Sequence, residues 1–330
     1  MTAINADGVF EGGGVKGIGL VGAVAGMEEA GYIFENIAGT SAGAIVAALL
    51  AVDYKAEEIK SELLKLDYKK FRDEGFLDKF GVIGKGLSTL LEYGIYEGNY
   101  FESWLGDLLE AKGKTTFGQI RTDYTEEKYM YRLQVIATDI TDHRLLILPQ
   151  DLKDFGLDPD QFSITKAVRM SMSIPLFFEP VKLEDRSGKV HIIVDGGVLS
   201  NYPIWLMDDG TSSPPWPTFG FKLMEPNTRE IKKGDPENII HNPLSYLLAL
   251  VGTMIGAHDN FYISKSKGDY NRTIGISTAI NIDGIEKEIK TTYFDITREE
   301  SLKLYDNGKK TAEEFLKTWD FEEWKKKYRQ

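Results

Sequence analysis

Two strand–turn–helix units follow one another directly at the start of the chain. The first joins an apolar stretch at 7–11 to a helical pattern over 16–30 through a cluster of glycines. The second joins 34–38 to the helix-forming stretch 44–52 through Gly39-Thr40-Ser41-Ala42-Gly43. Adjacent parallel strands need crossover connections of this kind, usually helices. We therefore expect an α/β protein with a mainly parallel central sheet.

The rest of the chain continues the alternation of strands and helices. Apolar runs predict strands at 131–138, 144–148, 190–194, 218–222 and 273–277, and helical spacing predicts helices near 163–173, 243–266 and 297–317. A loop rich in Pro, Gly and Ser occupies 208–217, but strand patterns continue beyond it. We predict one domain over residues 1–330 in a three-layer α/β/α arrangement. Its motif-bearing core spans about 7–205, and 206–330 completes it with helices.

Charge and cysteine content exclude several classes of protein. The chain has 39 Lys and Arg against 51 Asp and Glu, a formal net charge of −12. We therefore expect no nucleic acid partner, because phosphate backbones are bound by clustered Lys and Arg. There is no cysteine, so disulfides, thiolate metal sites and cysteine nucleophiles are excluded. The N-terminus lacks the basic and long apolar segments of a secretion signal, and we expect a cytoplasmic protein.

Ser41 is the first candidate catalytic residue. It lies at the centre of Gly39–Gly43, between a predicted strand and a predicted helix. This arrangement is typical of a nucleophile elbow, in which small residues allow a tight turn that exposes the serine hydroxyl. The N-terminus of the following helix also favours developing negative charge. The pattern predicts a serine nucleophile, although a turn that only lets a helix pack closely has the same residues.

A glycine-rich loop supplies candidate donors for an oxyanion hole. Gly12, Gly13 and Gly14 follow the first predicted strand, and their unobstructed N–H groups suit a tetrahedral oxyanion. The spacing of Gly12, Gly14 and Gly17 also matches a dinucleotide-binding fingerprint, with Glu35 as a ribose ligand. That alternative leaves the second turn, with a serine at its tip, unexplained.

Asp195 is the candidate base. It ends the apolar run 190–194 and is followed by Gly196 and Gly197, which allow an abrupt turn. Functional groups gather at the carboxyl ends of parallel strands, so we expect Asp195 to meet Ser41 there. Partial burial would raise the pKa of this carboxyl and make it a better base. The alternative is an ordinary Asp-Gly turn.

The four histidines offer a competing base. None of His143, His191, His241 and His258 lies in a catalytic motif. His241 and His258 nevertheless follow Ser41 and Asp195 in the chain order of an α/β-hydrolase triad. An esterase with a Ser-Asp-His triad therefore stays open as an alternative, as does a dinucleotide-binding protein.

Together the motifs resemble the patatin-like phospholipase family. The resemblance rests on Glu11-Gly-Gly-Gly-Val-Lys-Gly17, Gly39-Thr-Ser-Ala-Gly43 and Asp195-Gly-Gly197, in this order. The segment Ser171-Met-Ser-Ile-Pro-Leu-Phe-Phe-Glu-Pro-Val181 is also similar to a family segment. The similarity covers about 7–205, and the last third of the chain carries no matching motif.

The resemblance implies a patatin-like fold and hydrolysis of fatty acyl esters, with a phospholipid or another acyl-ester lipid as substrate and no cofactor or metal. It implies that Ser41 is the nucleophile, Asp195 the proton acceptor and Gly12–Gly14 the oxyanion hole. Glu11 stands where the family often has Asp, and Lys16 where Arg is frequent. Neither departure affects the Ser-Asp dyad. A catalytically inactive lipid-binding protein with the same motifs is a further alternative.

Contact with the lipid is predicted from three apolar regions. Aromatic residues across 71–104 and the uncharged helical stretch near 243–257 are candidates for an acyl groove, although such stripes are more often core. The tail 315–330 combines Trp and Phe with a basic run, which suits peripheral contact with a membrane as well as a solvated helix.

Overall fold

One mixed sheet organises the part of the chain that the computed structural model describes, namely residues 3–71, 98–208, 211, 213–225, 268–291 and 293–329, with single positions 246, 250 and 253. Its strands are β1 (Ile4–Phe10), β2 (Tyr32–Thr40), β3 (Leu133–Asp139), β4 (Arg144–Leu148), β5 (Val181–Glu184), β6 (Val190–Asp195), β7 (Thr218–Met224) and β8 (Thr273–Ser277). They follow the order β5-β6-β3-β2-β1-β7-β8, and β4 also pairs with β3.

Most neighbouring strands in this sheet are parallel. β8, β7, β1, β2 and β3 run in one direction. β4 and β6 are both antiparallel to β3, and β5 is antiparallel to β6. The prediction of an α/β fold with a mainly parallel sheet is therefore confirmed. The directions of β4 and β6 were not predictable, because an apolar run has the same pattern in either direction.

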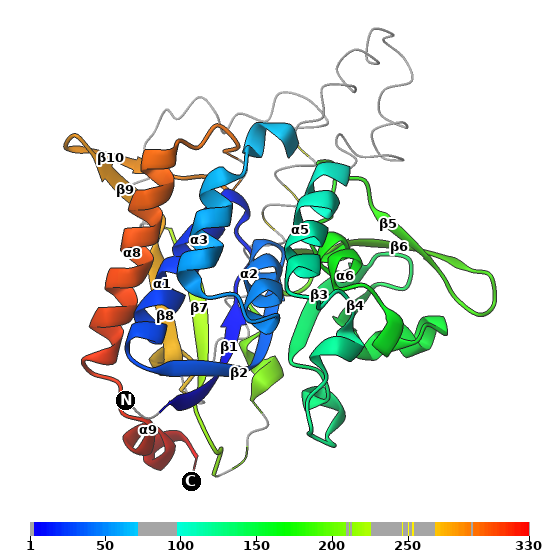
Figure 1. The fold of residues 1–330 in the computed structure, drawn as a ribbon, viewed down its shortest axis with the longest axis horizontal. Helices are drawn as coiled ribbons and strands as arrows, with labels where there is room; N and C mark the ends of the chain where they lie inside the picture. Colours follow the sequence, from blue (N-terminus) through cyan, green and yellow to red (C-terminus); the bar gives the residue numbers. More distant parts are fainter. Residues whose placement is uncertain are drawn as a thin grey trace, which may run out of the picture.

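Helices cover one face of the sheet (Figure 1). They are α1 (Gly17–Glu29), α2 (Ala42–Ala51), α3 (Ala56–Lys65), α5 (Asn99–Ala111), α6 (Ile164–Ser171) and α8 (Arg298–Leu316), while α9 (Phe321–Tyr328) lies near the chain termini. Nearly every residue of α1 and α2 is buried, because both helices are packed between the sheet and other helices. This explains why their sequences are almost uniformly small and apolar.

The other face has a smaller apolar cluster in the described part of the chain. Val9, Ala38 and Ile136 of three adjacent strands pack there against Leu206 and Met207 of the short 3-10 helix η9 (Ile204–Met207). The helix predicted near 243–266 and most of the uncharged stretch lie outside the described residues, so the three-layer arrangement stays a prediction on this face.

Residues 206–330 complete the sheet as well as adding helices. β7 pairs with β1, β8 pairs with β7, and the hairpin of β9 (Ala279–Ile282) and β10 (Ile285–Glu288) projects beside α8 (Figure 1). A single-domain organisation stays a prediction.

The aromatic residues of the tail face the protein. Phe315 and Trp319 pack against Phe219 of β7, with ring centroids 5.8 and 5.1 Å from it. Trp324 is buried and donates its Nε1–H to the carbonyl of Gly268 at 3.1 Å. These rings therefore serve the core rather than a membrane surface. Among the described residues, no helix has both the length and the apolar character needed to cross a bilayer.

Candidate active site

Ser41 occupies a strained turn between β2 and α2. Its φ of 52° and ψ of −125° fall in a region that non-glycine residues rarely adopt. The turn is tight because α2 starts directly against β1: a Cβ on Gly43 would lie 2.3 Å from the carbonyl oxygen of Phe10. Only glycine fits at position 43. The sequence thus forces the serine to the end of the strand, where it is 5% exposed.

Asp195 lies at the end of β6 and is 1% exposed. Its Oδ1 accepts the N–H of Gly197 at 2.7 Å, whereas its buried Oδ2 makes no hydrogen bond of good geometry with the described residues. Burial raises the pKa of this carboxyl from 3.8 to about 7, while the nearby Ser41 hydroxyl and the Gly197 N–H act in the opposite direction. A carboxylate with this pKa can accept a proton near neutral pH.

Strand pairing explains how the two residues meet. Thr40, the last residue of β2, pairs with Ile136 of β3, and Asp195 pairs with Ala137, the next residue along β3. One edge of β3 pairs with β4 over residues 135–139. The opposite edge pairs with β2 over 133–136 and with β6 over 137–139, so β2 and β6 end against each other along that edge. Asp195 therefore reaches Ser41 from an antiparallel strand. The expectation that both residues end parallel strands is wrong for β6.

The glycine loop lies beside the serine. A Cβ on Gly12 would lie 3.1 Å from the Cβ of Ser41. Gly12 is held by Asn201, whose carbonyl accepts the Gly12 N–H at 3.0 Å and whose Nδ2 donates to the Gly12 carbonyl at 3.1 Å. Of the three predicted oxyanion donors, Gly12 is thus already engaged. The N–H groups of Gly13 and Gly14 have no partner among the described residues.

Gly14 is a position where the backbone requires glycine. Its φ is +55°, and a Cβ there would lie 2.1 Å from the carbonyl oxygen of Thr291. That same carbonyl accepts the N–H of Val15 at 3.1 Å. The segment around Thr291 therefore supports the outer side of the glycine loop.

Glu11 and Lys16, the two departures from the family pattern, have structural partners. Oε1 of Glu11 accepts a hydrogen bond from Nζ of Lys222 at 2.6 Å, and Oε2 accepts the N–H of Leu223 at 2.5 Å. Lys16 is buried, and its Nζ lies 3.6 Å from a carboxylate oxygen of Glu225. Both pairs tie the glycine loop to the end of β7.

Sequence reasoning missed the residues that hold the backbone of the site. Ser171 is fully buried, and its Oγ accepts the N–H of Ser41 at 2.8 Å. Two residues later, the carbonyl of Ser173 accepts the N–H of Asp195 at 2.9 Å. The end of α6 therefore binds both candidate catalytic residues. Two sequence features could have identified these residues. Ser171 and Ser173 begin the segment that is similar to a family segment, and Asn201 lies shortly after Asp195-Gly-Gly197.

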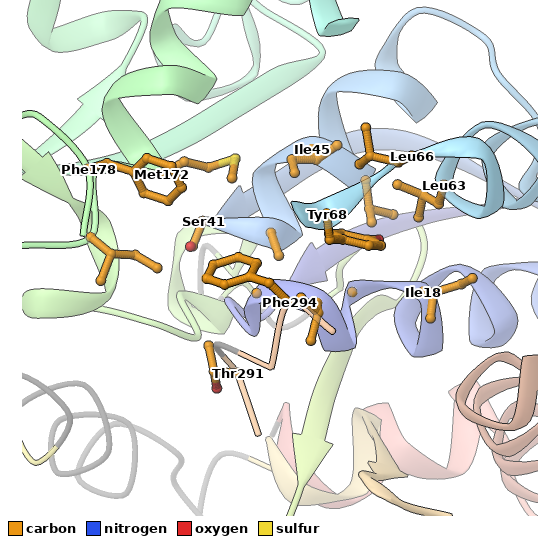
Figure 2. Close-up of a pocket in the computed structure, with 16 residues that line it drawn as sticks. Ile18, Ser41, Ile45, Leu63, Leu66, Tyr68, Met172, Phe178, Thr291 and Phe294 are labelled. Carbon is orange, nitrogen blue, oxygen red and sulfur yellow. The ribbon is translucent and has the colours of Figure 1, made fainter. Parts of the chain in front are cut away.

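An apolar channel leads from Ser41 (Figure 2). Its walls come from α1, α2, α3, the end of α6 and the segment after β10, and the labelled lining side chains are Ile18, Ile45, Leu63, Leu66, Tyr68, Met172, Phe178, Thr291 and Phe294. Among the aromatic residues predicted to form an acyl groove, the structure describes the side chains of Tyr100, Phe101 and Trp104. These three side chains pack on the hydrophobic core and do not line the channel.

The open interior of the channel is about 40 Å³. Ile45 lies one helical turn from Ser41 on α2, and its side chain lines the channel.

Other predicted residues lie elsewhere or outside the described residues. Glu35 is in the middle of β2, beside the β1 bulge between Ala6 and Gly8, so it is separated from the glycine loop that begins after Phe10. This placement does not suit a ribose ligand for that loop. His241 and His258 lie outside the described residues.

His191 belongs to a group that could hold a metal ion. Ligand atoms of Asp139, Asp142 and His191 lie within 4.8 Å of one another. Nδ1 of His191 already contacts Oδ2 of Asp139 at 2.7 Å, and Asp142 is ion-paired with Lys189. The polar atoms of this group are therefore already paired with protein groups. We interpret the group as a structural network that joins β3 to β6.

The sequence is similar to one protein family and to individual known proteins. Residues 8–208 match the profile of the family described as patatin-like phospholipase. The "Uncharacterized protein YqhO" of Bacillus subtilis (strain 168) is 39% identical over 315 residues, which are 96% of this chain and 99% of that protein. The "Probable lipid hydrolase 463L" of Invertebrate iridescent virus 6 is 28% identical over 207 residues, which are 59% of this chain and 61% of that protein.

Solved structures share the fold. VipD from Legionella pneumophila aligns with a TM-score of 0.56 at 20% identity, covering 95% of this chain and 67% of that chain. The type III effector protein ExoU of Pseudomonas aeruginosa aligns with a TM-score of 0.51 at 16% identity, covering 95% of this chain and 53% of that chain. At these identities the likeness concerns the fold alone.

Proposed function

The chain belongs to the patatin-like phospholipase family, and from this premise we propose that it is a lipid acyl hydrolase that cleaves fatty acyl esters with Ser41 and Asp195. One observation carries the proposal. Ser41 has a strained backbone, lines the apolar channel, and lies beside the buried carboxylate of Asp195. Oδ2 of that carboxylate makes no hydrogen bond of good geometry with the described residues. A serine, a base and an apolar site are the elements that acyl transfer from a lipid requires.

The first half of the reaction forms an acyl-enzyme. Asp195 accepts the proton of the Ser41 hydroxyl as Oγ attacks the ester carbonyl carbon. The carbonyl oxygen becomes an oxyanion, for which the N–H groups of Gly13 and Gly14 are the available donors of the predicted set. The tetrahedral intermediate then collapses, the bond to the alcohol oxygen breaks, and Asp195 returns the proton to the leaving alcohol.

The second half releases the fatty acid. Asp195 accepts a proton from a water molecule, whose oxygen attacks the acyl carbon bound to Oγ of Ser41. The same N–H groups stabilise the second oxyanion, and the proton passes to Oγ as the acyl–serine bond breaks. The dyad ends in its starting state, with fatty acid and alcohol as products.

The channel favours an acyl chain over a polar substituent. Apart from Ser41, Tyr68 and Thr291, the lining side chains are all apolar. Each methylene removed from water there contributes about 0.8 kcal/mol. A phospholipid or another acyl-ester lipid satisfies this requirement, and peripheral contact with a membrane would deliver it. That contact stays a prediction.

The activity is tested by fatty acid release from zwitterionic phospholipid vesicles and by hydrolysis of p-nitrophenyl esters. We expect turnover of both kinds of substrate and covalent modification of Ser41 by a fluorophosphonate, located by peptide mass spectrometry. An inactive wild-type protein that does not react with the fluorophosphonate would contradict the proposal.

Activity is expected to depend on the ionisation of Asp195. Because the base must be charged and burial raises its pKa to about 7, kcat/KM should rise about tenfold per pH unit below pH 7 and level off above it. Hydrolysis of p-nitrophenyl butyrate between pH 5 and 9 measures this. A profile that is flat through neutral pH would exclude a base with a raised pKa.

Enlarging Ile45 is expected to change chain-length preference. Ile45→Trp fills the channel one turn from Ser41, so hydrolysis of p-nitrophenyl laurate should fall about tenfold or more. Hydrolysis of the acetate ester should stay within about threefold, because its acyl group does not reach this position. The control is Ile33→Trp, at an isoleucine of β2 that is 40% exposed. Equal losses on both esters would indicate general damage to the site.

A further inference from the structure

A second cavity lies on the other face of the sheet, away from the channel. Its volume is about 160 Å³, and its lining includes Asp7, Asn36, Tyr124, Glu126 and Trp216. Cavities of about 150 Å³ in other proteins hold a benzene-sized molecule. Asp7 belongs to β1 and lies five residues before Gly12. Extended strand rises about 3.3 Å per residue, so about 16 Å of chain separates Asp7 from the glycine loop beside Ser41.

Asp7 is a buried carboxylate without a counter-charge. It is 5% exposed, and its Oδ1 accepts three N–H groups: the backbone and Nδ2 of Asn36 at 3.1 and 2.8 Å, and Nε1 of Trp216 at 2.9 Å. Its Oδ2 makes no hydrogen bond, and no cation pairs with Asp7 among the described residues. Buried charges are costly unless they are paired.

The groups around Asp7 make this end of the cavity negative. Burial raises the pKa of Asp7 to about 6, and the charge of nearby Glu35 adds to the rise. Glu126 lines the same cavity. Arg272 and Arg329 line it as well, but both are ion-paired with Asp208. At neutral pH the Asp7 carboxylate is therefore charged and uncompensated.

Aromatic rings complete the wall. The ring centroid of Tyr124 lies 6.1 Å from that of Tyr129 and 6.4 Å from that of Trp216, and all three residues line the cavity. Burial raises the pKa of the Tyr124 hydroxyl, and the negative charges of Glu35 and Asp7 raise it further. Tyr124 is therefore close enough to feel both charges. Ring faces attract organic cations. The ring of Tyr129 already has one, because Nζ of Lys128 lies 4.4 Å from its centroid, which leaves Tyr124 and Trp216 for a ligand.

We propose that this cavity binds a small organic ammonium ion, with Oδ2 of Asp7 as its counter-charge and the rings of Tyr124 and Trp216 as its walls. An ammonium group supplies the donor and the positive charge that Asp7 lacks, and its alkyl substituents suit the rings. A divalent metal ion fits less well, because it requires several oxygen ligands converging on one point.

The test uses ethylammonium and tetramethylammonium as separate probes, titrated into the full chain and followed by calorimetry and by saturation-transfer NMR. We expect saturable binding in the millimolar range. Asp7→Asn keeps an oxygen for Asn36 and Trp216 but removes the charge, and should weaken binding about tenfold or more. The matched control is Asp151→Asn, at another carboxyl whose pKa burial raises, and should bind as wild type does.

A second variant guards against a folding defect in Asp7→Asn. Tyr124 is 42% exposed, so Tyr124→Leu should fold and still lose about threefold or more in affinity for tetramethylammonium. The proposal is overturned if neither probe binds saturably, if Asp7→Asn and Tyr124→Leu both bind as wild type does, or if magnesium or potassium alone competes fully at equal concentration. Tighter binding of ethylammonium would assign the main role to Oδ2, and tighter binding of tetramethylammonium to the rings; both support the site.

Discussion

Ser41→Ala is expected to lower ester hydrolysis by at least about 10⁴-fold while the protein stays folded. The substitution removes the attacking oxygen and leaves the glycine loop, Asp195 and the channel in place. In other serine hydrolases, loss of the nucleophile costs up to about 10⁶-fold in kcat. The residual rate would reflect substrate binding and the oxyanion donors alone.

The measurement is kcat/KM for p-nitrophenyl butyrate, with circular dichroism and thermal unfolding to check the fold. Alanine keeps a Cβ at the positive φ of position 41, so the backbone strain of the turn is unchanged. Ser187→Ala, at a serine in the turn between β5 and β6, is the control and should retain full activity. A folded Ser41→Ala protein with a tenth or more of wild-type activity would mean that another residue is the nucleophile.

Asp195→Asn is expected to lower activity by about 10³-fold or more and to make the protein more stable. An amide has no basic oxygen for the serine proton, so the activation step fails. The same change removes a charge from a site that is 1% exposed. Because burial raises the pKa from 3.8 to about 7, the charged form costs about 4 kcal/mol of folding free energy.

The pH dependence of this gain follows from the direction of the pKa shift. A carboxyl whose pKa is raised in the fold costs nothing below its unfolded pKa, because it is protonated in both states. The cost grows as pH rises from about 4 to about 7 and is complete above that range. The stability advantage of Asp195→Asn should therefore be largest at pH 8 and close to zero at pH 4.

Urea unfolding of both proteins at pH 8 and pH 4 tests this. Asp151→Asn is the control for activity, since Asp151 is half-buried with a raised pKa but lies outside the site. A variant that is less stable than wild type at pH 8 would mean that Asp195 contributes hydrogen bonds worth more than its burial costs. An active variant would remove Asp195 as the base and favour the histidine triad.

Local motifs account for the part of the site that was predictable. A tight turn from a strand into a helix needs small residues on both sides of Ser41, and a run of three glycines leaves N–H groups free of side chains. Both requirements concern neighbours in the chain, so they can be read without a fold. Asp195 was identified in the same way, from an apolar run followed by two glycines.

Long-range pairing decided the rest. The contact between Ser41 and Ser171 joins residues 130 positions apart, and no local pattern marks it. The hydrogen bonds between Gly12 and Asn201 join residues 189 positions apart. They occupy the N–H of Gly12, whereas the N–H groups of Gly13 and Gly14 stay available to an oxyanion. The alternative role of Glu35 fails for the same reason, because strand register places it away from the glycine loop.

The sequence by itself determined the fold class, the family and the chemical groups offered for catalysis, since periodicity and small-residue turns are properties of short segments. Only the tertiary structure decided which groups meet and in what state. β6 runs antiparallel to β3, which sets Asp195 against the end of β2, and the packing around it removes water and raises its pKa. Burial and strand direction depend on the whole sheet, and therefore no single motif encodes them.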